Sequence, residues 1–132
     1  MRARFDVGIS SIDGKGIFAR SRIPARRKLG ELEGERITLR EARKRAALRR
    51  RIAIVELPKG GAIDASVGGN EFRYINHSCT PNAYIRIFGD HVEFYALRTI
   101  QRGEEVTCNY GETQHEGTLP CRCGGTRCRQ YL

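Results

Sequence analysis

Glycine and proline divide this chain into short pieces, and that division limits what it can fold into. The 132 residues include 15 glycines and 4 prolines, and most segments between them hold about a dozen residues or fewer. Segments of this length suit strands joined by tight turns better than long helices. Several of them alternate or carry apolar runs that predict strands. The predicted strands are 17–19, 29–35, 52–57, 62–65, 84–88, 92–98 and 104–110, with a Gly89-Asp90 turn joining 84–88 to 92–98.

One longer segment predicts a helix. Thr38 can cap its N-terminus, and Glu41, three residues later, is the matching member of a capping box. Leu39, Ala42 and Ala46 then fall on one helix face. This apolar stripe is thin, so the helix should be only shallowly buried. Together the segments predict a mainly β fold of short strands with one basic helix and a small cysteine-rich tail.

The length and composition favour one globular domain. A chain of 132 residues suits a single hydrophobic core, and 39% hydrophobic with 30% charged residues is typical of globular rather than disordered proteins. No apolar run approaches the ~20 residues that span a bilayer, and residues 1–5 lack the apolar core of a secretory signal. We therefore expect an intracellular protein with no membrane partner. In that setting, clustered cysteines are more often metal ligands than disulfide partners.

Most of the positive charge lies in one segment. The net charge is +9, and residues 36–51 hold eight basic residues against one acidic residue. The basic residues are Arg36, Arg40, Arg43, Lys44, Arg45, Arg49, Arg50 and Arg51. Such a patch could bind nucleic acid, an anionic surface or an acidic protein, or could be a solvated helix face. It has no interleaved aromatic residues, which weakens the case for a platform that stacks single-stranded bases.

The C-terminal residues carry a metal-binding pattern. Cys121, Cys123 and Cys128 have the spacing C-x-C-x4-C, which lets three thiolates converge on one ion. Structural zinc prefers four ligands, so a fourth must come from Cys79, Cys108 or one of the three histidines. We favour Cys79, which lies in a loop-like sequence, over Cys108, which lies in a predicted strand where a thiol usually packs as a small hydrophobic group. The alternative is a set of unpaired or disulfide-bonded cysteines.

A series of motifs, all in one order, carries a family resemblance. The motifs are Gly14-Lys15-Gly16 with the apolar strand after it, segment 29–35, Ile63-Asp64-Ala65, Gly69-Asn70, RYINHSCTPN at 73–82, GEEVTCNYG at 103–111, and the cysteine tail. Over about residues 5–130 the chain resembles a SET-domain protein-lysine N-methyltransferase with a post-SET zinc segment. The resemblance implies a SET domain at 1–116 with a basic insert at 36–52, and a post-SET zinc-binding segment at 117–132. It also implies several small curved sheets and a knot-like threading near the C-terminus.

The resemblance further implies a reaction and roles for individual residues. S-adenosylmethionine would donate methyl groups to the side-chain amine of a lysine in a protein. Tyr110 would be the catalytic tyrosine. The implied cofactor contacts are Gly14, Lys15, Gly16, Arg73, Asn76, His77 and Tyr110. In the family the fourth zinc ligand is the cysteine after Asn-His-Ser, so one structural zinc would be held by Cys79, Cys121, Cys123 and Cys128.

Two positions in the implied substrate pocket depart from the family pattern. The pocket residues by position are Tyr74, Cys108 and Ala53. Ala53 stands where many relatives have tyrosine, and Cys108 stands two residues before Tyr110, where relatives usually have phenylalanine or tyrosine. A thiol is much smaller than either ring. We therefore expect a roomier pocket that can make di- or trimethyl-lysine.

Three functions remain open on these residues. The first is a lysine methyltransferase acting on a histone or another nucleic-acid-associated protein. The second is a catalytically silent SET-like module that binds protein or nucleic acid through its basic helix. The third is a small zinc-binding nucleic-acid protein, which does not explain Asn76, His77 and Tyr110 together. We expect a monomer or homodimer, in the cytoplasm of a bacterium or the nucleus of a eukaryote.

Overall fold

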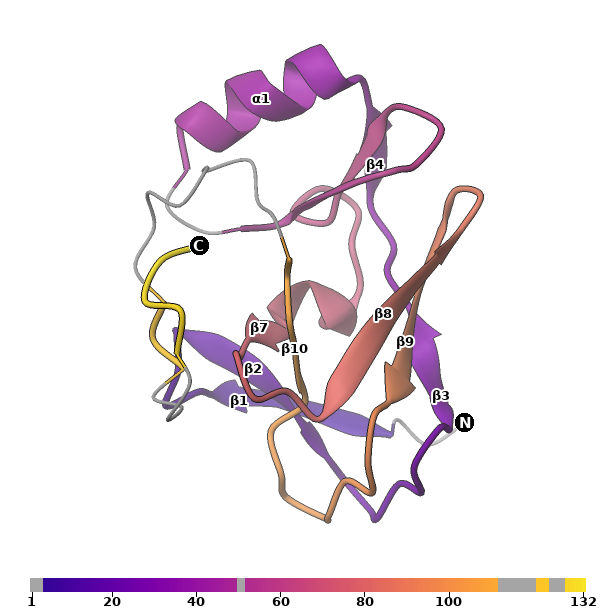
Figure 1. The fold of residues 1–132 in the computed structure, drawn as a ribbon, viewed down its shortest axis with the longest axis vertical. Coiled ribbons are helices and arrows are strands. Elements are labelled where there is room, and N and C mark those ends of the chain that lie inside the picture. Colours follow the sequence, from indigo (N-terminus) through magenta and orange to yellow (C-terminus); the bar gives the residue numbers. More distant parts are fainter. Residues whose placement is uncertain (1–3, 50–51, 112–120, 124–127) are drawn as a thin grey trace.

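The computed structural model describes residues 4–49, 52–111, 121–123 and 128–132 (Figure 1). These residues form a mainly β fold, as predicted, with α1 as the α-helix of the described part. The elements in chain order are β1 (Phe5–Ile9), β2 (Lys15–Ala19), β3 (Lys28–Glu31), β4 (Glu35–Ile37), α1 (Leu39–Ala47), β5 (Ile54–Glu56), β6 (Ala62–Asp64), the 3-10 helix η1 (Glu71–Tyr74), β7 (Asn76–His77), β8 (Ala83–Phe88), β9 (His91–Ala96) and β10 (Thr107–Cys108).

The strands form small separate sheets. β1 and β2 make an antiparallel hairpin, β9 lies between β3 and β8, and β6 lies between β4 and β5. β7 and β10 pair in parallel, which brings residues 76–77 beside residues 107–108. Figure 1 shows α1 and β4 at one end of the molecule and β1 and β2 toward the other, with the β7–β10 pair between them. The predicted knot-like threading stays a prediction.

The hairpin and the helix follow the sequence prediction closely. β8 and β9 pair from Ala83 with Ala96 to Phe88 with His91, so Gly89 and Asp90 form the two-residue turn. The Oγ1 of Thr38 accepts a hydrogen bond from the backbone N–H of Glu41 at 3.1 Å, which caps α1. Ala42 and Ala46 are the buried residues of α1, as its thin apolar stripe indicates.

The alternation over 29–35 predicts a single strand, and this is wrong; the residues instead belong to two strands, β3 and β4, which agrees with the strand pair that the family resemblance implies here. The chain leaves β9 after Leu32, whose backbone N–H donates to the Val92 carbonyl at 2.8 Å, and then joins β6 as β4. Gly34 lies at this crossing, where a Cβ would overlap the Asp64 carbonyl oxygen and the Ala65 backbone. The alternating residues are thus divided between two sheets, that of β3, β9 and β8 and that of β4, β6 and β5.

The predicted strand over 104–110 is regular only at Thr107–Cys108. Before that, Glu105 forms an isolated bridge with Phe18, and the Val106 N–H donates to the Ile17 carbonyl at 2.9 Å. This segment therefore runs from β2 to β7 and links the N-terminal hairpin to the centre of the fold.

An aromatic stack from η1 fills the core. The ring of Phe72 packs edge-on against Phe5 and in a stacked arrangement against Phe94, with ring centres 5.6 and 5.4 Å apart. Gly30 permits this packing, because a Cβ at that position would overlap the Phe72 ring. η1 has no counterpart among the elements predicted from the sequence. No helix in the described ranges is long and apolar enough to cross a membrane.

Candidate functional site

A cavity of about 380 Å³ lies between strands of different sheets. The segment containing β5, the β8 strand, η1 and the residues from Cys108 to Gly111 all contribute to its wall. Among the residues singled out from the sequence, it brings together Ala53, Arg73, Cys108 and Tyr110. Most of the remaining lining is aliphatic or aromatic, so the cavity favours an uncharged guest.

Tyr110 is held at both ends by the segment that contains β7. Its hydroxyl donates a hydrogen bond to the Ile75 carbonyl oxygen at 2.5 Å. Its backbone N–H donates to the Nδ1 atom of His77 at 2.9 Å, and the two rings lie 5.2 Å apart between centroids. The phenol therefore has a fixed position on the cavity wall.

Asn76 ties the glycine-rich turn to the centre of the fold. Its side-chain amide nitrogen donates to the carbonyl oxygens of Asp13 and Lys15 at 3.1 and 3.0 Å. It also lies 2.9 Å from a carboxylate oxygen of Glu105. Gly16 leaves room for that carboxylate, because a Cβ at this position would overlap it. Gly14 in the same turn has φ +45°, a conformation that glycine adopts without strain.

Two cations lie against Tyr74. The Nζ atom of Lys15 is 5.6 Å from the centre of the Tyr74 ring, and the Cζ atom of Arg73 is 4.6 Å from it. Tyr74 is not among the residues that line the cavity, although Arg73 is. Of the predicted cofactor contacts, Gly14 lies in the turn before β2, Lys15 and Gly16 begin β2, Arg73 lies in η1, Asn76 and His77 form β7, and Tyr110 follows β10.

His77 is a buried, neutral imidazole. Only 4% of its surface is exposed, and burial, with a smaller effect of the Arg129 charge, lowers its pKa to about 4. Its Nε2 atom lies 3.3 Å from the Sγ of Cys79. The ring therefore stands between Tyr110 and the cysteine tail.

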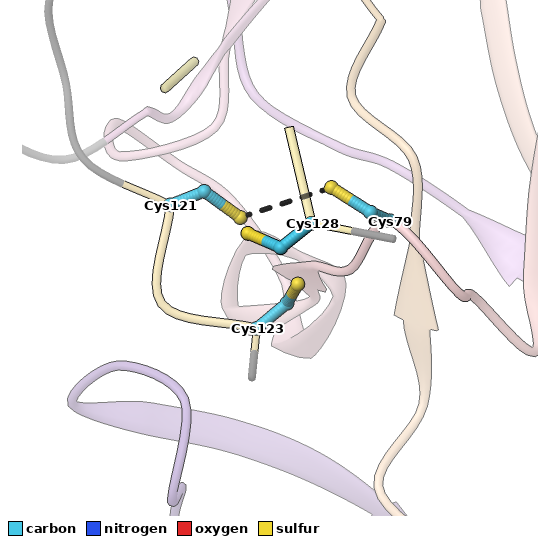
Figure 2. A group of neighbouring side chains, drawn as sticks. All are labelled: Cys79, Cys121, Cys123 and Cys128. Atoms are coloured by element: carbon cyan, nitrogen blue, oxygen red, sulfur yellow. Dashed lines mark hydrogen bonds between the residues drawn. The ribbon is translucent and has the colours of Figure 1, made fainter. Parts of the chain in front are cut away.

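Four cysteines converge as the sequence predicts. The Sγ atoms of Cys79, Cys121, Cys123 and Cys128 all lie within 4.8 Å of one another, and Figure 2 shows the four side chains pointing toward a common centre. Tetrahedral thiolates at ~2.3 Å from zinc would be ~3.8 Å apart. The Cys79–Cys121 separation is 3.9 Å, close to that spacing, and every other pair lies within 4.8 Å, so the four sulfurs are near enough to hold one ion together.

The surroundings of the four-cysteine cluster suit a cation. Burial first, and neighbouring thiols after it, raise the pKa of Cys121 to about 12. A divalent ion would reverse that effect by stabilising the thiolates. Backbone N–H groups of Arg129 and Gln130 donate to the sulfurs of Cys79 and Cys128 at 3.2 and 3.3 Å.

Cys108 does not join the cluster. It is 1% exposed in the cavity wall, where burial raises its pKa to about 12.

Part of the basic insert is neutralised within the fold. Arg45 and Arg49 each donate to the fully buried carboxylate of Asp64 at 2.9 Å, and the Ser66 hydroxyl donates to it at 2.6 Å. Burial raises the pKa of the Asp64 carboxyl, but the hydrogen bonds from Arg49, Ser66 and Arg45 outweigh it and hold the pKa well below its usual range.

Arg45 also pairs with Glu35 and Glu41, and Arg36 pairs with Asp90. Arg40, Arg43 and Lys44 remain exposed on α1, and Arg50 and Arg51 lie outside the described residues. The charged segment is therefore partly an anchor that joins α1 to the end of β6. It is less of a free basic surface than its composition indicates.

Three polar residues that the sequence analysis missed support the site. Asn82 is 2% exposed; its amide donates to the Glu105 carbonyl at 2.7 Å and its Oδ1 accepts from the Thr107 N–H at 2.9 Å. The Ser10 hydroxyl donates to the Glu105 carboxylate at 2.8 Å. The signal for Asn82 was its place directly after Pro81 in the longest motif. Glu105 likewise lies in the motif at 103–111, whereas Ser10 lies in none of the motifs and its partners are distant in sequence.

The predicted boundary between residues 116 and 117 falls outside the described residues.

A model of the SET domain matches residues 14–111. The chain is 37% identical, over 93% of its length, to the histone-lysine N-methyltransferase trithorax of Drosophila virilis. It is 35% identical, over 93%, to histone-lysine N-methyltransferase 2B of Homo sapiens. It is 36% identical, over 95%, to the H3 lysine-4 specific histone-lysine N-methyltransferase of Schizosaccharomyces pombe.

These matches cover only a small part of each relative, namely 3%, 5% and 15% of their respective lengths. They nevertheless extend across nearly the whole of this chain, from the glycine-rich turn to the cysteine tail. The matched SET region contains the turn that Asn76 holds, the cavity wall and Tyr110. The chain belongs to the SET-domain family.

Proposed function

We propose that this protein is an S-adenosylmethionine-dependent methyltransferase that modifies the side-chain amine of a lysine in a protein substrate. The observation that carries the proposal is Tyr110, whose hydroxyl is fixed by the Ile75 carbonyl on the wall of a mostly apolar cavity. The names of the three relatives support a histone as the substrate protein, and the name of the Schizosaccharomyces pombe relative supports histone H3. With that substrate, the reaction would take place in the nucleus of a eukaryotic cell.

The cavity has to deliver a neutral amine in a fixed orientation. S-adenosylmethionine, when bound, supplies an electrophilic methyl group whose leaving group is a neutral thioether. A lysine amine has a pKa of ~10.4 in water, so it arrives protonated, and burial among aliphatic side chains favours loss of that proton. The Tyr110 O–H donates to the Ile75 carbonyl, and this bond orients the phenol oxygen, which would accept an N–H from the amine. That contact directs the nitrogen lone pair for attack.

The cofactor would lie near the turn before β2, beside η1 and β7. Lys15 and Arg73, which both lie against the Tyr74 ring, are positioned to attract a carboxylate. Asn76 contributes by fixing the backbone of the turn at Asp13 and Lys15. Gly14 and Gly16 allow the backbone to take this path.

One structural zinc ion fits the four cysteines. Cys79, Cys121, Cys123 and Cys128 form a closed donor set with no open ligand position, which is typical of structural rather than catalytic zinc. The ion would join the C-terminal tail to the segment after β7. Metal analysis of freshly purified protein should find about one zinc per chain, and its absence would contradict this assignment.

The size of the pocket supports multiple methylation. Cys108 and Ala53 both line the cavity with small side chains. A pocket without an aromatic ring at these two positions can accommodate a dimethylated amine and its turnover to trimethyl-lysine. Mass spectrometry of a histone H3 peptide after exhaustive reaction should show di- or trimethylated product. Strictly monomethylated product would contradict this part of the proposal.

Binding and chemistry can be tested separately. Metal-loaded protein should bind S-adenosylhomocysteine in a calorimetric titration and transfer labelled methyl groups to a histone H3 peptide. Tyr110→Phe should keep cofactor affinity and lose roughly 10²-fold or more in kcat. If the wild-type protein does not bind the cofactor product, the methyltransferase proposal is wrong. Binding without transfer to any histone would favour the silent module instead.

The nucleic-acid alternatives have less support from the fold. Arg36, Arg45 and Arg49 pair with carboxylates, which reduces the charge that the basic insert can offer to phosphates. A protein substrate therefore stays the principal expected partner, and the choice between monomer and homodimer remains a prediction.

A further inference from the structure

His77 contacts the four-cysteine cluster with one ring nitrogen and the backbone of Tyr110 with the other. The Nε2–Sγ distance to Cys79 is 3.3 Å, and the Tyr110 N–H donates to Nδ1 at 2.9 Å. The ring is 4% exposed, so water does not compete effectively for either nitrogen. One buried side chain thus spans the distance between the metal ligands and the residue that faces the cavity.

The hydrogen-bond directions follow from the chemistry of the groups. A backbone N–H can only donate, so Nδ1 must present its lone pair to Tyr110. Because Nδ1 then carries no proton, the ring's proton resides on Nε2, which points it at the sulfur of Cys79. That sulfur also receives the N–H of Arg129 at 3.2 Å. Cys79 is therefore arranged to accept two hydrogen bonds, as a metal-bound thiolate does.

Metal binding changes the strength of this arrangement. A thiolate held by a cation is a charged acceptor, and hydrogen bonds to charged acceptors are about twice as strong as those to neutral ones. A neutral sulfur is a weaker acceptor than a thiolate. Loading the cluster should therefore tighten the Nε2–H contact and fix the imidazole ring. The ring in turn fixes the backbone of Tyr110.

We propose that His77 is a positioning residue that couples metal binding at the four-cysteine cluster to the placement of Tyr110. Because the coupling is thermodynamic, it acts in both directions: conditions that order Tyr110 should also tighten metal binding. The consequence for methyl transfer rests on the proposed function. The coupling itself does not, and it can be measured without any substrate.

The first experiment measures hydrogen exchange of the Tyr110 backbone amide by NMR in zinc-loaded and chelator-stripped protein. Removal of zinc should accelerate that exchange at least roughly fivefold, the lower end of common coupling energies. Equal exchange rates with and without zinc would overturn the proposal. The amide of Val92, which is fully buried in β9, serves as the internal reference for global opening.

Two variants divide the contacts of His77. His77→Gln places an amide near the Nε2 position and removes the acceptor for the Tyr110 N–H. We expect its zinc affinity to stay close to the wild-type value, while the Tyr110 amide exchanges rapidly whether or not zinc is present. His77→Asn keeps an acceptor near the Nδ1 position and removes the donor to Cys79. Its zinc dissociation constant should rise roughly tenfold, in the range seen for groups that hydrogen-bond metal ligands, and zinc should no longer affect the Tyr110 amide.

The exposed His91 provides the matched control. Its ring pairs with Glu31 at the surface, and His91→Gln should leave zinc affinity and the Tyr110 exchange response unchanged. If both His77 variants respond to zinc as the wild type does, the coupling does not pass through His77. In a methyl-transfer assay, His77→Gln should lower kcat more than it raises KM for the cofactor. Failure of the wild type to transfer methyl groups would count against the proposed function only, since the exchange and zinc measurements still decide the coupling.

A measurement on the wild type covers the case in which neither variant folds. In protein loaded with ¹¹³Cd, a proton on His77 Nε2 that bonds to the Cys79 thiolate should show a scalar coupling to the metal. Detection of that coupling supports the contact. A His77 ring protonated on Nδ1, or an Nε2 proton with no coupling to cadmium, would overturn the proposal.

Discussion

Replacement of Asp64 by asparagine should destabilise the fold markedly while leaving its shape nearly unchanged. The carboxylate is fully buried and receives donors from Arg45, Arg49 and Ser66 at 2.9, 2.9 and 2.6 Å. Asparagine retains one acceptor oxygen for Ser66. Its NH2 group, however, would face guanidinium donors, and the negative charge that holds two arginines of the insert would be absent.

The expected magnitude follows from the exposure of the partners. Breaking a buried ion pair by removing one partner costs ~3–5 kcal/mol. The side chains of Arg45 and Arg49 are 24% and 29% exposed, so water can partly solvate them once the carboxylate is gone. We therefore expect a loss near the lower end, ~3 kcal/mol. For a chain of 132 residues that corresponds to a drop of about 10 °C in Tm.

Thermal unfolding followed by circular dichroism at neutral pH is the appropriate assay. Asp90→Asn is the matched control, because Asp90 pairs with Arg36 at the surface, where removal of one charge should change Tm very little.

The folded-state pKa of Asp64 is lowered. The ionised carboxylate therefore makes its full contribution to the free energy of unfolding above the unfolded-state pKa of ~3.9. That contribution is lost as the pH falls through the lower folded-state pKa. The difference in Tm between wild type and variant should stay constant from pH 7 to about pH 4 and should become smaller below that. A variant that melts within about 2 °C of wild type would refute the reasoning.

Other substitutions test the backbone, the pocket and the helix. Gly69→Ala should cost ~3 kcal/mol, measured by urea unfolding, because its Cβ would overlap the Ala65 carbonyl oxygen. Gly89→Ala, whose Cβ meets nothing within 4 Å, should cost only the ~1–2 kcal/mol of its positive φ. Cys108→Phe should fill part of the cavity and confine the product to monomethyl-lysine by mass spectrometry, whereas Cys108→Ala should retain higher methylation. Thr38→Ala should lower Tm by about 4 °C through loss of the helix cap, a change of ~1 kcal/mol in the free energy of unfolding.

The local features of this fold could be predicted from the sequence. The two-residue turn at Gly89-Asp90 sets the register of its hairpin, and the cap at Thr38 marks where α1 begins. In both cases the determining contacts lie within a few residues of one another. The four-cysteine cluster was also predictable, since the spacing of the tail cysteines and the loop position of Cys79 narrow the choice of ligands.

The remaining features depend on contacts between distant segments. The break in the predicted strand over 29–35 results from the close approach of Gly34 to Asp64 and Ala65, which no local pattern encodes. The anchoring role of Asp64 was hidden for the same reason, because Arg45 and Arg49 could equally have faced solvent. A lone acidic residue in the apolar run 62–65 was the available signal, and it indicated burial without naming the partner.

The cavity is bounded by strands that belong to different sheets. β5 belongs to the sheet of β4 and β6, β8 to the sheet of β3 and β9, and β10 pairs only with β7 among the described strands. The relative placement of these walls therefore depends on core packing and on side-chain tethers between segments. Asp64 holds the β5–β6 side to α1, Asn82 holds the approach to β10, and His77 contacts both Tyr110 and Cys79. Because catalysis is sensitive to shifts of about 1 Å in the reacting groups, loss of such a tether should reduce activity under conditions where the fold still persists.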